Sequence, residues 1–156
     1  MDLLGKSTAL AAIIALSPGC SPKWPSERFP PELEVKRTLF VGGQGGLRET
    51  CEAMIVEITD SSASRTFRLR TSKNGIKVVL PADWKSTPIA AGEEPAFYEG
   101  AFGGCNNSGN NSGGVPLGDV PGWLKRPGAF YKVINGGEGV AIIVPRIKLA
   151  GFYYVG

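Results

Sequence analysis

Hydrophobic positions are densest in the last third of the chain, where short apolar runs alternate with turn-forming residues. Phe130–Ile134 and Val140–Val144 are rich in β-branched and aromatic residues, which favours strands. Asn135–Gly139 separates them and predicts a tight hairpin, because glycine and asparagine readily adopt the positive φ angles that such turns require. Val140–Val144 is apolar on both faces, so we expect it at the centre of a sheet.

A last strand is predicted over Ile147–Val155, after Pro145 ends the preceding run. Its three aromatic residues are Phe152, Tyr153 and Tyr154. We expect them to pack in the core and at the sheet edge rather than to form a binding stripe, because aromatic residues are enriched in strands generally. This strand would tie the C-terminal residues into the sheet.

The first half of the chain adds two more strands. Leu33–Val41 alternates loosely between apolar and polar residues, and Cys51–Thr59 is apolar enough for a sheet interior. Gly42–Gly46 between them predicts a flexible hairpin connection, since its glycine spacing does not fit a dinucleotide- or phosphate-binding loop. The sequence therefore predicts a mainly β fold, with one small domain over residues 33–156 built on a mostly antiparallel sheet.

Residues 61–73 fit two structures. Asp60 or Ser61 would cap a short helix that stops at Gly75, which would make the fold α+β. Alternatively, Thr66–Arg70 is a strand that turns at Lys73–Gly75 into the apolar run Ile76–Leu80. The helix is slightly favoured, because Asp-Ser-Ser directly after a strand is a good capping sequence.

The region between residues 81 and 127 is rich in turn-forming residues. Ala96–Phe102 is a possible strand, and Pro121–Pro127 predicts a turn-rich approach to the C-terminal strands. Residues 103–114 are almost entirely glycine, asparagine and serine, so they predict a loop that buries no apolar surface. This loop contains no Asp or Glu, which makes it a poor calcium site.

The N-terminal residues have the pattern of an export signal. Lys6 precedes the apolar stretch Thr8–Leu16, which is shorter than the roughly 20 residues that span a bilayer. Ser17-Pro18-Gly19-Cys20 follows, and this arrangement resembles a bacterial lipoprotein precursor. The resemblance implies that residues 1–19 are removed, that Cys20 carries diacylglycerol, and that Ser21 directs the protein to the outer membrane, facing the periplasm. Soluble periplasmic or secreted protein is the alternative, because Ser17 and Gly19 also suit an ordinary signal peptidase.

Residues 20–32 follow this leader and contain four prolines, which predicts a stiff tether between anchor and domain. Trp24 and Phe29 fit equally well as parts of that tether or as side chains packed on the domain.

Cys51 and Cys105 remain if Cys20 is lipidated, and two cysteines in an oxidising compartment predict a disulfide. The alternative is two reduced, buried thiols. The cysteine spacing and the absence of histidine from the sequence give no metal site, and nothing in the sequence implies a cofactor.

Composition narrows the functional classes. Without histidine, the chain cannot build Ser-His-Asp or Cys-His catalytic machinery. The net charge of +3 is too small to indicate a nucleic-acid partner, and the pairs Arg68/Arg70 and Lys125-Arg126 suggest solvated surface.

Two classes of function remain. The first is a non-enzymatic envelope protein, attached to the membrane through its lipid, that binds an envelope protein, polymer or small ligand or serves in assembly. The alternative is a small histidine-free hydrolase that uses a pair of carboxylates. Its candidate acids lie in turn-rich segments and are Glu93, Glu94, Glu99, Asp119 and Glu138.

Overall fold

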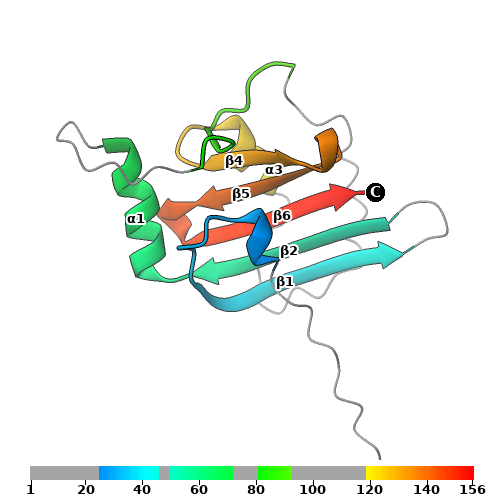
Figure 1. The fold of residues 1–156 in the computed structure, drawn as a ribbon, viewed down its shortest axis with the longest axis horizontal. Coiled ribbons are helices and arrows are strands. Elements are labelled where there is room, and N and C mark those ends of the chain that lie inside the picture. The colour runs from blue at the N-terminus through cyan, green and yellow to red at the C-terminus, as the bar shows by residue number, and fades with distance from the viewer. Residues whose placement is uncertain (1–24, 46–49, 72–80, 93–118) are drawn as a thin grey trace, which may run out of the picture.

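The computed structural model describes residues 25–45, 50–71, 81–92 and 119–156 (Figure 1). Six strands form one antiparallel sheet in the order β1-β2-β6-β5-β4-β3. They are β1 (Val35–Gly45), β2 (Thr50–Ile58), β3 (Lys85–Ser86), β4 (Phe130–Ile134), β5 (Gly139–Val144) and β6 (Leu149–Val155). The other described elements are the helices α1 (Asp60–Thr71) and α3 (Val120–Lys125) and the 3-10 turns η1 (Ser26–Arg28), η3 (Asn135–Gly137) and η4 (Pro145–Ile147). The predicted mainly β, single-domain fold is confirmed.

β6 occupies the centre of the sheet and joins its two halves. Tyr153 pairs with Ala53 of β2 on one side and with Val140 of β5 on the other. The expected tie of the C-terminal residues is present too, since Gly156 and Thr50 exchange backbone hydrogen bonds of 2.8 and 2.7 Å. β5 is central as predicted, and all six of its residues are buried.

Both faces of the sheet are buried. Side chains alternate across each strand, so successive residues contribute to the cores on opposite faces. On one face, Ile55 and Tyr153 lie in a core cluster with Val120 and Leu124 of α3. On the other face, Val56 and Phe152 lie in a second cluster. The aromatic residues of β6 therefore serve the core as predicted: Phe152 and Tyr153 are buried and Tyr154 is half-buried.

The second face is covered by the N-terminal segment, which crosses in front of β2 and β6 at η1 (Figure 1). Phe29 is buried and its ring centroid lies 5.8 Å from that of Trp84. Arg28 places its guanidinium carbon 4.7 Å from the ring centroids of both Phe152 and Tyr154. Phe29 is therefore packed on the domain, which was one of its two predicted alternatives. The packed region consequently begins before Leu33. Trp24 lies outside the described residues.

α1 is the helix of the two structures proposed for residues 61–73. Its cap is Thr59, however, and not Asp60 or Ser61: the Ser62 N–H donates to the Thr59 hydroxyl over 3.3 Å. Ser62 is buried, accepts a hydrogen bond from the Glu34 N–H (2.9 Å) and so ties the first turn of α1 to the residues before β1. Among the described residues, no helix has the length and apolar character needed to cross a membrane.

Three boundaries differ from the sequence predictions. β1 continues through Gly45, where a flexible connection was expected, because Gly42–Gly45 pair with Thr50–Ala53. A helix replaces the expected turn-rich segment before Pro127, because Pro121 is tolerated in a first helical turn and Val120 and Leu124 bury the same helical face. β6 begins at Leu149 and not at Ile147, because Lys148 has φ 55 and breaks the extended backbone.

The tight hairpin between β4 and β5 is confirmed, with Asn135, Gly136 and Gly137 all at positive φ. β3 was not anticipated from the sequence. Three predicted segments lie outside the described residues: the apolar run Ile76–Leu80, the strand Ala96–Phe102 and the loop 103–114.

Close packing between β2 and β6 leaves no room for a side chain at Gly151. A Cβ there would lie 2.7 Å from the Met54 carbonyl oxygen and 3.1 Å from Cγ1 of Ile55. We expect Gly151→Ala to lower the free energy of unfolding by about 1–3 kcal/mol, as overpacked cores do. Chemical denaturation measures this change.

Gly122→Ala is the matched control, because the nearest atom to a Cβ there is 3.8 Å away, at the end of the Arg126 side chain. Since Gly122 lies within α3, alanine should leave stability unchanged or raise it by about 0.5–1 kcal/mol. Equal stabilities for the two variants would contradict the close β2–β6 packing.

Candidate functional site

An open groove of about 980 Å³ lies at the end of the sheet where β5 gives way to β6. Three segments form its walls: the first turn of α1, the residues that follow α3, and η4. Its described lining residues are Asp60, Ala63, Ser64, Trp123, Arg126, Pro127, Gly128, Ala129, Val144, Pro145, Arg146, Ile147 and Lys148. Figure 1 shows α1 standing beside this end of the sheet.

η4 forms the wall between β5 and β6. Its 3-10 turn is closed by a hydrogen bond from the Lys148 N–H to the Pro145 carbonyl, over 3.1 Å. The Lys148 carbonyl accepts from the Ile58 N–H at 2.9 Å, which fixes the turn against the end of β2. Arg146, Ile147 and Lys148 are all exposed as a result.

The segment that follows α3 is also held in place by hydrogen bonds. Buried Thr87 clamps Ala129: its hydroxyl accepts from the Ala129 N–H (3.0 Å) and donates to the Ala129 carbonyl (3.1 Å). The Ile89 N–H donates to the Leu124 carbonyl at 2.9 Å, which anchors the end of α3. Arg126, with an extended backbone, thus leaves the helix along a fixed path.

The groove carries a surplus of positive charge. Its described lining has three cationic side chains, Arg126, Arg146 and Lys148, and one carboxylate, Asp60. Lys148 is paired with Asp60 at 2.5 Å, whereas neither arginine makes an ion pair within the described part of the chain. Two guanidinium groups therefore remain uncompensated.

The Asp60–Lys148 pair stays ionised over the physiological range. The hydrogen bond from Lys148, and then its charge, lower the pKa of Asp60 from its ordinary 3.8. The same two effects of Asp60 raise the pKa of Lys148 from 10.5. The charge that these two groups give the groove is consequently constant from mildly acidic to mildly alkaline pH.

The rest of the groove lining is largely apolar. Ile147 is 45% exposed, more than the other exposed large hydrophobic residue of the described chain, Val133. Trp123 is half-buried and packs against the core cluster that contains α3. Val144, Pro127 and Pro145 add further hydrocarbon to the lining. Such a cavity, mostly apolar with a few polar groups, has the size and chemistry of ligand-binding sites in general.

The sequence did not identify this groove. The Lys125-Arg126 pair was interpreted as solvated surface, and both residues are exposed; what the sequence did not show is that Arg126 also lines the groove. The available signal was the pair of motifs in which an arginine adjoins a proline, Arg126-Pro127 and Pro145-Arg146. Only the fold brings these two motifs together, because they lie on either side of the β4–β5 hairpin.

Of the acids proposed for a hydrolase, the two that the structure describes do not line this groove. Asp119 is exposed at the start of α3, Glu138 is exposed in the β4–β5 turn, and neither is a lining residue. Glu93, Glu94 and Glu99 lie outside the described residues. Within the described residues, no group of three or more Cys, Asp or Glu side chains is placed to hold a metal ion.

Cys51, in β2, is half-buried and is disulfide-bonded. Cys20 and Cys105 lie outside the described residues, so the pairing of Cys51 with Cys105 remains a prediction.

Comparison with family models, with curated proteins and with solved structures finds no match to this chain. The site is therefore interpreted from its own residues.

The Asp60–Lys148 pair predicts a measurable titration. Asp60 should titrate below 3.8 in the folded chain, and Lys148→Gln should return its midpoint toward that value. NMR of the Asp60 carboxyl carbon measures both. Because folding depresses this pKa, the contribution of the pair to stability is complete above the ordinary pKa and is lost as pH falls through the depressed one.

Lys85→Gln is the control, since Lys85 lies in β3 and is not among the described residues that line the groove. It should leave the Asp60 midpoint unchanged. The same midpoint in the wild type and in the Lys148→Gln variant would show that the pair does not form in solution.

Proposed function

We propose that this protein is an exported, lipid-anchored bacterial envelope protein that binds an anionic ligand in the groove and catalyses no reaction. The anchor rests on the leader sequence and on Cys20. The binding role rests on one observation: Arg126 and Arg146 line a largely apolar groove and have no carboxylate partner among the described residues.

Charge complementarity explains why the ligand is an anion. The backbone is fixed on both sides of the groove, at η4 and at Ala129, so the segments that carry the two arginines are positioned before a ligand arrives. Guanidinium groups bind carboxylates or phosphates through pairs of charge-assisted hydrogen bonds. Since the backbone is already ordered, the conformational entropy lost on binding is mainly that of the two arginine side chains.

A fluorescent anionic probe tests the binding role. We expect 8-anilinonaphthalene-1-sulfonate to bind the full chain carrying Cys20→Ser, and the double variant Arg126→Gln/Arg146→Gln to bind it about tenfold more weakly, the effect of losing charge-assisted hydrogen bonds. Asp60→Asn should act in the opposite direction, because it releases Lys148. Fluorescence titration gives all the dissociation constants.

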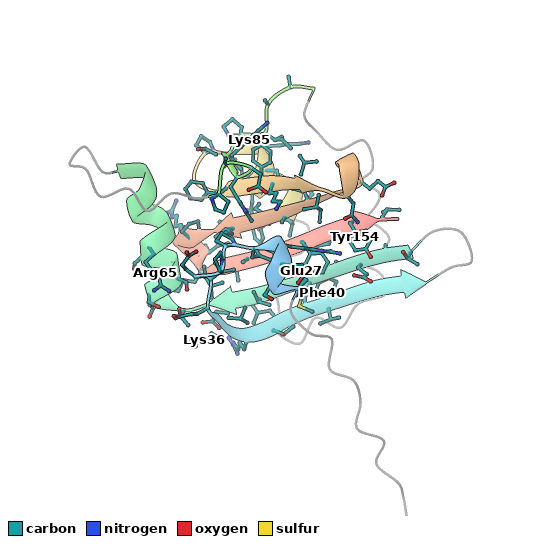
Figure 2. The ribbon with its side chains drawn as sticks, viewed as in Figure 1. Glu27, Lys36, Phe40, Arg65, Lys85 and Tyr154 are labelled. Carbon is teal, nitrogen blue, oxygen red and sulfur yellow. The ribbon has the colours of Figure 1, made fainter. Side chains whose placement is uncertain are left out.

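Lys36→Gln/Lys85→Gln is the matched control, because it removes the same net charge from residues that do not line the groove. Lys36 lies in β1, where it pairs with Glu57 at 2.8 Å, and Lys85 lies in β3, at the other edge of the sheet (Figure 2). Its affinity should stay within about twofold of wild type, because neither lysine lines the groove and solution ions screen exposed charges that do not contact the ligand. If the two double variants weaken binding equally, only net charge matters and the groove is not the site.

The mass of the protein purified from a bacterial envelope tests the anchor. We expect a chain that begins at Cys20 and carries lipid, with Cys51 and Cys105 open to alkylation only after reduction. Cys20→Ala should abolish the lipid without changing the other two cysteines. A full-length, unlipidated chain with three free thiols would contradict both the anchor and the disulfide pairing.

A further inference from the structure

We infer that the ligand of the groove is a single-chain amphiphile, an acyl chain that ends in a carboxylate. This inference rests on the proposed function and names the class of ligand that the same site takes. Arg126 and Arg146 hold the head group, and the apolar lining between Trp123 and Ile147 covers the chain.

The head group follows from the two arginines. A guanidinium presents a planar fork of N–H donors that matches the two oxygens of a carboxylate. Arg126 and Arg146 belong to different walls of the groove, one after α3 and one in η4, and both line the same cavity. Lys148 is already paired with Asp60, which leaves the arginines as the free cations of the described lining.

The acyl chain of the ligand is inferred from the apolar lining. Ile147 is 45% exposed and lies beside uncompensated positive charge. A small inorganic anion would neutralise that charge but would leave the isoleucine in water and most of the 980 Å³ unfilled. A hydrocarbon chain attached to the anion covers Ile147, Val144 and the Trp123 ring, and each buried methylene contributes to affinity.

The chemistry of the walls favours an acyl chain over a peptide or a sugar. Pro127 and Pro145 have no backbone N–H, so these wall residues offer no backbone donor to the main-chain carbonyls of a peptide. The hydroxyl groups of a sugar would meet mainly alkyl groups and cations, and buried hydroxyls without partners are costly. An acyl carboxylate needs only what this lining supplies: hydrocarbon for its body and guanidinium for its head.

Calorimetric titration of the Cys20→Ser chain with octanoate, decanoate and dodecanoate, all below their micelle concentrations, tests this inference. Affinity should rise about fourfold per methylene, the equivalent of ~0.8 kcal/mol. The matching alcohols should bind at least tenfold more weakly, and Arg126→Gln/Arg146→Gln should reduce the carboxylates to the level of the alcohols. Ile147→Ser should flatten the dependence on chain length and retain the preference for carboxylate over alcohol.

Dodecanoate should also displace the anilinonaphthalene probe. If the probe depends on the two arginines but dodecanoate does not displace it, the ligand class is wrong and the proposed function stands. If the probe does not depend on the arginines, both fail. Equal affinity for acetate and dodecanoate, or displacement by an acidic peptide or by anionic phospholipid vesicles but not by dodecanoate, would likewise overturn the acyl carboxylate.

Discussion

The structure depends on the pairing of β6 with β2 on one side and with β5 on the other. On one side of β6 lies the β1–β2 hairpin and on the other the β4–β5 hairpin with the two-residue β3 at its edge, and a hairpin alone is at best marginally stable in water. β6 joins the halves into a surface broad enough for two cores, and its aromatic residues contribute to both: Tyr153 on the face of α3, Phe152 on the face of η1. Gly151 permits the close approach of the strands.

A sheet buried on both faces needs two covers, and the covers within the described part of the chain are short. α3 spans only Val120–Lys125, and the opposite cover is a 3-10 turn with Phe29 beside it. Arg28 extends that cover by lying over Phe152 and Tyr154, where its alkyl stem and planar head group pack on aromatic rings. The groove forms where the covers end, because β5 turns into η4 there and the residues after α3 run back to β4.

The sequence predicted those parts of the fold in which a local pattern suffices. Val140–Val144 is apolar throughout and Asn135–Gly137 has the residues of a left-handed turn, so strand and hairpin were both found. α3 was missed because its signal, Pro121 between two buried apolar residues, resembles a turn until the sheet is present to bury Val120 and Leu124. The groove was missed for the same reason: Arg126 and Arg146 become neighbours of one cavity only through pairing of β4 with β5.

The central place of β6 also sets the order in which the chain can fold. Thr50 and Gly156, which close the β2–β6 ladder, are 106 positions apart, so contacts of high sequence separation complete the sheet. While the chain emerges N-terminus first, the β1–β2 hairpin waits with one long edge unpaired until the final strand is available. If the chain is exported as proposed, an envelope chaperone that shields that edge until β6 pairs with it would protect the chain from aggregation.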